Sequence, residues 1–226
     1  MIRVELPGAE AVFSTRRGGV SEPPYDSLNL GILTDDHRAR VERNRALLAE
    51  KAGLDGRGVA MGWQVHGTGV RRWDAPPEDG DLERVDAHVT AREDLALLVI
   101  VADCLPIALA GEGAVAMVHA GWRGLAGGIV EQAAAELGDV RAAAVGPAIG
   151  RCCYEVGEEV LAQFDARFAD GRMLDLRAVA EDRLRAAGVE RIEHVDMCTS
   201  CRADLFFSHR RDDGVTGRQG GLVWRA

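Results

Sequence analysis

The chain has no long apolar run and no excess of basic charge. Its longest apolar stretch, 95–102, is far shorter than the roughly 20 residues that a membrane-spanning helix needs. The 27 Lys and Arg residues are outnumbered by 36 Asp and Glu residues, which gives a formal net charge of −9. Because binding to nucleic acid depends on clustered cations, this balance argues against a nucleic-acid-binding protein. We therefore expect neither a nucleic-acid nor a membrane partner, and we infer no obligatory protein partner.

Signals for export and for a disulfide framework are also missing. Glu5 and Pro7 stand where the apolar core of a signal peptide would begin. The five cysteines are an odd number, so they cannot all pair within the chain. A reducing cytoplasm is the expected location.

No internal repeat and no linker rich in Pro, Gly or Ser divides the chain. Pro76, Pro77, Asp79 and Gly80 predict a surface loop that is too short to tether two domains. With 226 residues, 47% of them hydrophobic, the chain is long enough for one substantial core. We therefore expect a single domain over residues 1–226.

Apolar stretches rich in β-branched residues predict strands, and periodic apolar positions predict helices. The expected strands are 11–15, 59–65, 70–73, 85–91, 95–102, 114–118, 140–145, 192–195 and 222–224. The expected helices are 36–52, 125–137, 156–168 and 176–187. Candidate N-caps precede the first helix at 34–36, and Gly53 should end it. This order favours an α/β (α+β) domain with mixed β-sheets and flanking helices over a doubly wound fold.

Two histidines and a cysteine stand at the edges of apolar stretches, beside predicted turns. They are His66 in W-Q-V-H-G, Cys104 in V-A-D-C-L-P and His119 in M-V-H-A-G-W-R-G. Imidazole and thiolate are ligands that zinc prefers, and three protein ligands leave a fourth position open for chemistry. Together the three residues form a candidate catalytic zinc site. Taken singly, each also fits a core histidine or an inert buried thiol.

The same atoms allow an alternative without a metal. Cys104 could act as a nucleophile that His66 or His119 activates, with Asp103 orienting the base. Asp103 equally fits a cap at the end of a strand or a buried hydrogen-bond acceptor.

Three arginines are candidates for binding an anionic substrate. Arg123 lies at the start of the helix after His119, Arg16 precedes Gly18-Gly19, and Arg218 lies in T-G-R-Q-G-G. Fixed guanidinium groups suit phosphate or ribose. Solvated or ion-paired surface arginines are the simpler alternative for each.

The remaining cysteines form a lone C-x-x-C, Cys198 and Cys201, and an adjacent pair, Cys152 and Cys153. A structural zinc bound by all four is conceivable. A vicinal pair chelates poorly in one tetrahedron, however, and the usual second C-x-x-C is missing. Buried small thiols are therefore the favoured interpretation.

Several motifs follow one another along nearly the whole chain, from about Phe13 to Trp224. In order, they are S-T-R-R-G-G-V-S, S-L-N-L-G, Q-V-H-G, A-D-C-L-P, H-A-G-W-R-G, G-P-A-I-G-R-C-C-Y-E-V-G, C-T-S-C-R and S-H-R-R-D-D-G-V-T-G-R-Q. Together they closely resemble the laccase-domain family of bacterial purine nucleoside phosphorylases. Members of this family are also called polyphenol oxidases and peptidoglycan editing factors.

The resemblance implies a single α/β domain with mixed sheets, similar to cysteine-hydrolase toxins. It also implies that His66, Cys104 and His119 bind zinc, and that Arg16 and Arg218 contact phosphate or substrate. The implied activities are phosphorolysis of adenosine, inosine, guanosine and methylthioadenosine, together with deamination of adenosine. Purine nucleosides and phosphate would then be the small-molecule partners.

The chain departs from the family pattern in two places. The loop after S-L-N-L-G, Ile32 to Asp36, reads I-L-T-D-D where many relatives have H-V-G-D-D. The D-A-x-V-T element usually has an apolar third residue, and here that residue is His88. A tolerated substitution is the favoured interpretation of His88, with a role near the site as the alternative.

The number of histidines argues against one of the activities that these family names suggest, multicopper oxidation. A multicopper oxidase needs about ten histidines, partly as H-x-H pairs, and this chain has six and no such pair. Oxidase activity would therefore require copper at the zinc site, as is possible in vitro.

An open zinc position suits deamination, for which Asp103 is the candidate proton shuttle, while phosphorolysis needs phosphate held by Arg16, Arg123 or Arg218. We expect a zinc-dependent purine nucleoside phosphorylase with adenosine deaminase activity; the alternatives are a peptidoglycan-editing hydrolase with Cys104 as nucleophile, a polyphenol oxidase and a non-catalytic protein.

Overall fold

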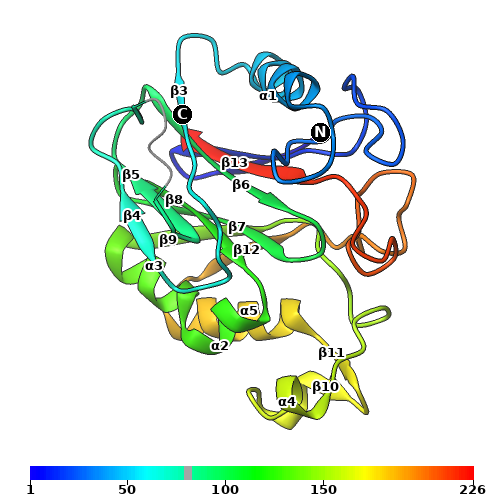
Figure 1. The fold of residues 1–226 in the computed structure, drawn as a ribbon. Helices are drawn as coiled ribbons and strands as arrows, with labels where there is room; N and C mark the ends of the chain where they lie inside the picture. Colours follow the sequence, from blue (N-terminus) through cyan, green and yellow to red (C-terminus); the bar gives the residue numbers. More distant parts are fainter. Residues whose placement is uncertain (79–82) are drawn as a thin grey trace.

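Two mixed β-sheets stack face to face at the centre of the molecule, and helices cover their outer faces (Figure 1). The computed structural model describes residues 1–78 and 83–226, so Asp79 and Gly80 of the expected loop lie outside the described residues. The five-stranded sheet contains, in spatial order, β1 (Ile2–Leu6), β2 (Ala9–Phe13), β13 (Gln219–Arg225), β6 (Leu95–Val101) and β3 (Gly58–Ala60). The six-stranded sheet contains β12 (Arg191–His194), β9 (Val140–Val145), β7 (Leu105–Gly111), β8 (Val115–Ala120), β5 (Ala87–Thr90) and β4 (Val70–Arg72).

Each sheet combines parallel and antiparallel pairs, as the irregular order of elements predicts. In the five-stranded sheet β3 runs parallel to β6 and the other pairs are antiparallel. In the six-stranded sheet the two edge strands, β12 and β4, run parallel to their neighbours. The expected single domain with mixed sheets and flanking helices is confirmed.

The helices divide between the two outer faces. The first, α1 (Arg38–Ala52), covers the five-stranded sheet. Three others cover the six-stranded sheet: α2 (Trp122–Gly127), α3 (Ile129–Leu137) and α5 (Leu176–Ala186). A small end region holds α4 (Glu158–Leu161), a 3₁₀ turn (Ala166–Phe168) and the hairpin β10 (Ala169–Asp170) and β11 (Met173–Leu174). No helix among the described residues is long and apolar enough to cross a membrane.

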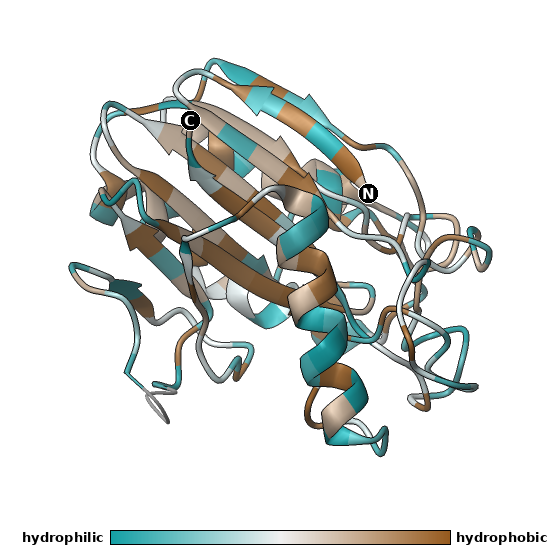
Figure 2. Ribbon diagram, turned by 90° about the horizontal axis from the view of Figure 1, so that it is seen from above, coloured by the Kyte–Doolittle hydropathy of each residue, from teal (hydrophilic) through white to brown (hydrophobic). Residues whose placement is uncertain are grey.

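The apolar core lies in three layers between these elements. β6 contributes to two of these layers. Its odd-numbered residues from Leu95 to Val99 pack between the sheets, whereas Ala96 and Leu98 pack under α1. Both faces of this strand are covered, which explains the continuous apolar run of the sequence. In Figure 2 the central strands are mostly brown, and the outermost hairpin alternates brown and teal. The same alternation appears in the burial of β1, whose outer residues face solvent.

Helix ends follow local signals in part. Gly53 ends α1 in a left-handed conformation with φ 77°, as predicted. The expected N-cap residues do not cap this helix, because the Asp36 carboxylate accepts hydrogen bonds from Ser21 and Asn29 and the helix begins two residues later. The single helix expected over 125–137 is wrong: Gly128, with φ 87°, separates α2 from α3.

The structure differs from the sequence patterns at two further points. The sequence does not predict β7, because Pro106 is a poor strand residue and the preceding turn interrupts the apolar pattern. The helix expected over 156–168 is reduced to four residues. Its apolar side chains do pack against the core, but Val156 and Leu174 form hydrogen bonds to Arg172 and Tyr154 that hold this region in an irregular arrangement.

Candidate metal centre

His66, Cys104 and His119 converge, with their ligand atoms all within 4.8 Å of one another. His119 lies near the end of β8, and Cys104 directly precedes β7, the antiparallel neighbour of β8. The turn between β6 and β7 carries the chain from one sheet to the other, and it is this turn that brings Cys104 beside His119. His66 arrives from the loop between β3 and β4, and its ring meets the His119 ring edge-on at 4.8 Å between centroids.

Asp103 shapes the turn that presents Cys104. Its φ of 87° lies in the left-handed region, which residues other than glycine rarely adopt. The buried Asp103 carboxylate accepts hydrogen bonds from Thr199 Oγ1 at 2.5 Å, Ser208 Oγ at 3.0 Å and the Arg210 backbone N–H at 2.7 Å. These three bonds fix the turn against the loop around residue 200. These bonds give Asp103 a structural role. Asp103 also lines, next to Cys104, the cavity described below.

Asp86, which the sequence interpretation missed, orients His119 and the loop that carries His66. Its fully buried carboxylate lies 2.8 Å from His119 Nδ1 and accepts backbone hydrogen bonds from Val65, His66 and Gly67. Burial alone would raise the pKa of Asp86, but the hydrogen bonds from His119 and the backbone outweigh it and lower this pKa to about 2. A signal was present, since Asp86 opens the D-A-x-V-T element directly before the buried strand β5, and an acid in such a position is a natural partner for a metal-binding histidine.

Cys104 and His119 shift each other's pKa in opposite directions. Burial would raise the pKa of Cys104, but the positive charge of His119 and hydrogen bonds from both histidines lower it to about 6. Burial would lower the pKa of His119, yet the Cys104 charge and the hydrogen bond to Asp86 raise it to about 9. These opposite shifts favour a thiolate beside an imidazolium when no metal is bound.

Gly121 leaves room for the three candidate ligands. A Cβ atom at this position would lie 3.1 Å from both Cys104 Sγ and His66 Cδ2, which is tighter than nearly all real contacts. With the convergent donors and the Asp86–His119 bond, this space fits a metal ion. Two imidazoles and one thiolate are a donor set typical of borderline-soft ions.

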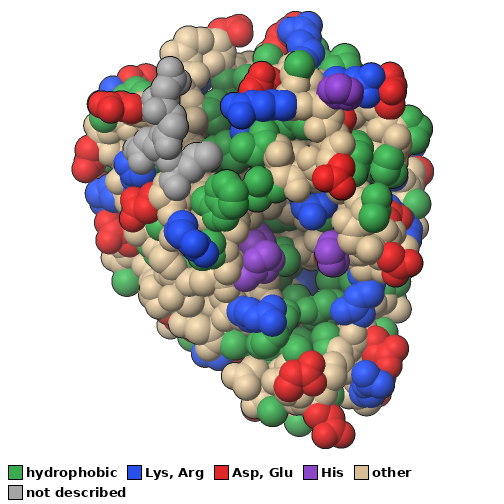
Figure 3. Space-filling view, viewed as in Figure 1, with side chains coloured by type: hydrophobic (Ala, Val, Ile, Leu, Met, Phe, Trp, Pro, Cys, Tyr) green, Lys and Arg blue, Asp and Glu red, His purple; other side chains and the backbone are tan. Residues whose placement is uncertain are grey.

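The centre lies in the wall of a cavity of about 510 Å³, a size typical of small-molecule sites. Figure 3 shows the hollow at the middle of this face, with histidine and basic side chains around it. Arg123 and Arg218 both line this cavity. The Arg123 guanidinium stacks on Trp122 at 4.2 Å, and Arg218 donates hydrogen bonds to the carbonyls of Thr216 and Gly217.

The structure does not bring Arg16 to this cavity. Its guanidinium donates hydrogen bonds to Asp26 and to the Ala203 carbonyl, and it lies 4.7 Å over the Phe207 ring. Arg16 lines a separate, smaller hollow with Arg17. The contacts of Arg16 therefore join the N-terminal loop around Asp26 to the segment 203–207.

Of the two departures from the family pattern, one lies in the cavity wall and the other is buried in a strand. The divergent loop, Ile32 to Asp36, contributes Ile32, Leu33 and Thr34 to the cavity wall. His88 is fully buried in β5, where its Nδ1 accepts a hydrogen bond from Trp73 Nε1 at 3.2 Å. Burial lowers the pKa of His88 to about 4, so this side chain is neutral at physiological pH.

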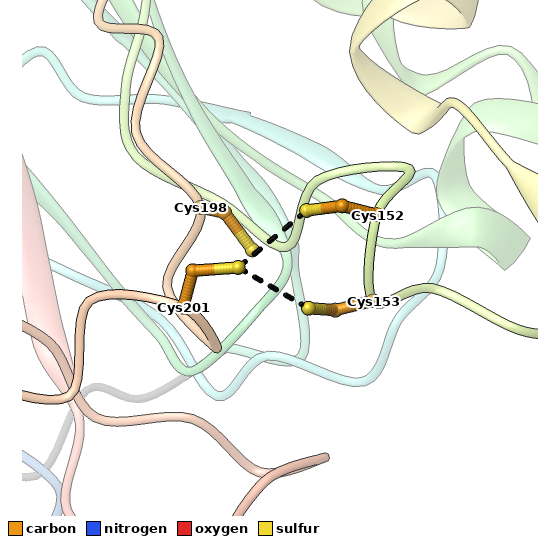
Figure 4. A group of neighbouring side chains, drawn as sticks. All are labelled: Cys152, Cys153, Cys198 and Cys201. Carbon is orange, nitrogen blue, oxygen red and sulfur yellow. Dashed lines mark hydrogen bonds between the residues drawn. The ribbon is translucent and has the colours of Figure 1, made fainter.

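The other four cysteines form a second cluster, and the favoured interpretation of buried thiols is wrong. Cys152 and Cys201 are exposed, Cys153 and Cys198 are partly buried, and all four Sγ atoms lie within 4.8 Å of one another (Figure 4). None of the four is in a disulfide. Sequence spacing could not show this proximity, because it depends on which strands are neighbours.

Comparisons with known proteins agree with this architecture. The family model described as "Multi-copper polyphenol oxidoreductase laccase" matches residues 10–226. The purine nucleoside phosphorylase SCO2081 of Streptomyces coelicolor is 42% identical, covering 98% of each chain. The purine nucleoside phosphorylase YfiH of Shigella flexneri is 38% identical, over 96% of this chain and 94% of its own.

Two solved structures share the fold. YlmD from Geobacillus stearothermophilus superposes with a TM-score of 0.88 at 34% identity, covering 96% of this chain and 92% of its own. The Neisseria meningitidis protein NMB0706 superposes with a TM-score of 0.87 at 33% identity, covering 99% and 98%. The motifs, the fold and the relatives agree, and the chain belongs to the laccase-domain family that includes the YfiH purine nucleoside phosphorylases.

Proposed function

We propose that this protein is a zinc-dependent purine nucleoside phosphorylase acting on adenosine, inosine, guanosine and methylthioadenosine, with adenosine deaminase activity at the same site. One observation carries the proposal: three metal-type ligands and two arginines, Arg123 and Arg218, face one cavity of about 510 Å³. The names of the relatives support phosphorolysis. The expected cytoplasmic location would supply both nucleosides and phosphate.

His66, Cys104 and His119 would hold the zinc ion, with copper as a substitute in vitro. Asp86 accepts the Nδ1 proton of His119 and so leaves Nε2 as the ligand atom. Bound zinc supplies a Lewis acid that polarises an oxygen of the substrate or of water. A set of only three protein ligands leaves a position open for such an oxygen.

The rest of the cavity suits a nucleoside and an anion. Arg218 is anchored through one guanidinium nitrogen, Nη1, and Arg123 is positioned by Trp122, so both are held for charge-assisted hydrogen bonds to phosphate. The apolar lining from Met61, Trp63 and Ile100 offers surfaces for a purine ring. Phosphorolysis requires the phosphate to attack ribose C1′ while the base leaves, so the cavity must hold both together.

Deamination requires in addition a group that carries a proton to the leaving amine. Asp103 is our candidate because it lines the cavity beside Cys104. The Asp103 carboxylate also fixes the turn that presents Cys104, so a loss of deaminase activity in Asp103→Asn could come from a displaced turn. Thr199→Val is therefore the control variant. That variant removes one of the three tethers and leaves the acid in place. A shuttle role predicts that Asp103→Asn reduces deamination far more than Thr199→Val does.

The proposal is tested by incubating the zinc-loaded protein with adenosine or inosine, with and without phosphate, and separating the products by chromatography. Free base and ribose-1-phosphate should appear only with phosphate. Inosine should form from adenosine without phosphate. Absence of all three products would overturn the proposal.

A cysteine hydrolase acting on peptidoglycan is the second candidate, and one observation favours it. Cys104, His119 and Asp86 form a chain of hydrogen bonds like that of a nucleophile, a base and an orienting acid. Such an enzyme would keep its activity when the metal is stripped and lose it on alkylation of Cys104. Polyphenol oxidation by the copper-loaded protein tests the remaining alternative.

A further inference from the structure

The topology of the six-stranded sheet brings together the two cysteine pairs, which lie far from each other in sequence. β9 and β12 are parallel neighbours, so the turns that follow them emerge side by side. Cys152 and Cys153 lie in the turn after β9, and Cys198 and Cys201 in the turn after β12. Ala148 pairs with Cys198 as an extension of the parallel ladder, and Thr199 N–H donates to the Ala148 carbonyl at 3.0 Å.

The sulfur positions match a metal centre better than a disulfide. The Cys201 Sγ lies 3.6 Å from the Cys152 Sγ and 3.4 Å from the Cys153 Sγ. A disulfide requires about 2.05 Å. Tetrahedral zinc with Zn–S bonds of about 2.3 Å requires sulfurs about 3.8 Å apart. The four side chains point toward a common centre in Figure 4.

The backbone around the cluster supports bound thiolates. The Gly150 N–H donates to Cys198 Sγ at 3.2 Å, which stabilises negative charge on that sulfur. A Cβ atom at Gly150 would lie 3.3 Å from Cys152 Sγ and from Cys198 Cβ, so glycine allows the two turns to approach closely. The cluster also reaches the surface through Cys152 and Cys201, which gives an ion a path of entry.

We propose that Cys152, Cys153, Cys198 and Cys201 form a second, structural zinc site. Four protein ligands close the coordination shell, which distinguishes this site from the open three-ligand centre. The two turns would otherwise be joined mainly by backbone hydrogen bonds, and the metal would cross-link them.

The same turns hold the wall of the open centre. Thr199, between the two C-x-x-C cysteines, donates to Asp103, and Ile149 N–H donates to the Asp103 carbonyl at 2.9 Å. Zinc in the four-cysteine site would therefore stabilise the turn that presents Cys104. This inference does not depend on which reaction the open centre catalyses.

The test counts metal in the full chain, purified under reducing conditions and loaded with zinc. We expect two zinc ions per chain in the wild type, one in Cys104→Ser, one in Cys201→Ser and none in the double variant. Ser200→Ala, in the same turn but without a ligand, should keep two. Zinc should also raise the melting temperature of Cys104→Ser, and this rise should vanish when Cys201→Ser is added.

Cobalt substitution identifies the ligands even if Cys201→Ser folds poorly. Cobalt-loaded Cys104→Ser should show the strong visible and near-ultraviolet absorption of a tetrahedral all-thiolate site. The proposal is overturned if the wild type binds a single zinc that is lost with Cys104→Ser. It is equally overturned if mass spectrometry of the native protein shows disulfides among the four cysteines and no zinc there.

Discussion

The Nδ1 atom of His119 lies 2.8 Å from Oδ1 of Asp86, and both side chains are buried. This contact fixes the ring of His119, a candidate metal ligand, and places a negative charge next to it. The carboxylate also accepts three backbone hydrogen bonds from the loop that carries His66. One acid therefore sets the position of two of the three candidate ligands.

Replacing this acid should weaken metal binding. Asp86→Asn removes the charge and turns one acceptor into a donor facing backbone N–H groups. We expect zinc affinity at the open centre to fall by about 10–100-fold, measured by competition with a chromophoric chelator. A parallel denaturation curve separates this loss from unfolding, and unchanged affinity in a folded variant would contradict the role of Asp86.

Gly121 offers a test of crowding at the ligands. Gly121→Ala is compatible with the backbone, whose φ of −81° suits any residue, but its Cβ would press on Cys104 and His66. Zinc affinity should fall by roughly tenfold because the ligands must shift by a fraction of an ångström, and a denaturation curve of the metal-free variant separates this effect from a loss of stability. Gly67→Ala is the matched control, since its Cβ would meet neighbours at an ordinary 3.5 Å. Equal affinities for the two variants would exclude this account.

Substitutions of Arg16 and Arg218, two of the three candidate phosphate arginines, should have different effects on the KM for phosphate. Arg218→Gln removes a cation from the cavity and should raise the KM for phosphate by about 10–100-fold, the value of a charge-assisted hydrogen bond. Arg16→Gln removes an ion pair and a contact with Phe207, so it should lower stability by about 1–2 kcal/mol and leave this KM nearly unchanged. A larger KM effect from Arg16→Gln would place phosphate elsewhere.

Much of this fold and part of the site follow from sequence patterns. β9 has the predicted bounds, Gly53 ends α1, and the three candidate ligands converge in the structure. Local patterns succeed at these points because the signals are local: an apolar run, a glycine with positive φ, and residue types with metal affinity.

The missed features depend on contacts between distant segments. Whether Arg16 or Arg218 faces the cavity is decided by which loops pack together, and Arg16 finds its partners in Asp26 and Ala203. The four-cysteine cluster exists because β12 pairs with β9 across about fifty residues of sequence. The Asp86–His119 contact likewise requires β5 to lie beside β8.

His88 should make stability dependent on pH. Its folded-state pKa is about 4 and its ordinary value is 6.5, so the unfolded chain binds the proton more readily. Stability from this group is complete above pH 6.5 and declines as the pH falls towards 4, by about 3 kcal/mol in total. His88→Gln keeps an acceptor for Trp73 but does not titrate. Denaturation of the metal-free proteins at several pH values should show a flatter profile for the variant, and parallel profiles would refute the prediction.

The most direct measurement of the central claim is phosphorolysis of inosine by the stripped protein before and after zinc is restored. The three-ligand zinc centre predicts no hypoxanthine from the stripped protein, and hypoxanthine with equal ribose-1-phosphate once zinc and phosphate are both present. His66→Ala should abolish this recovery. Undiminished activity after stripping, or no product after reloading, would contradict the claim.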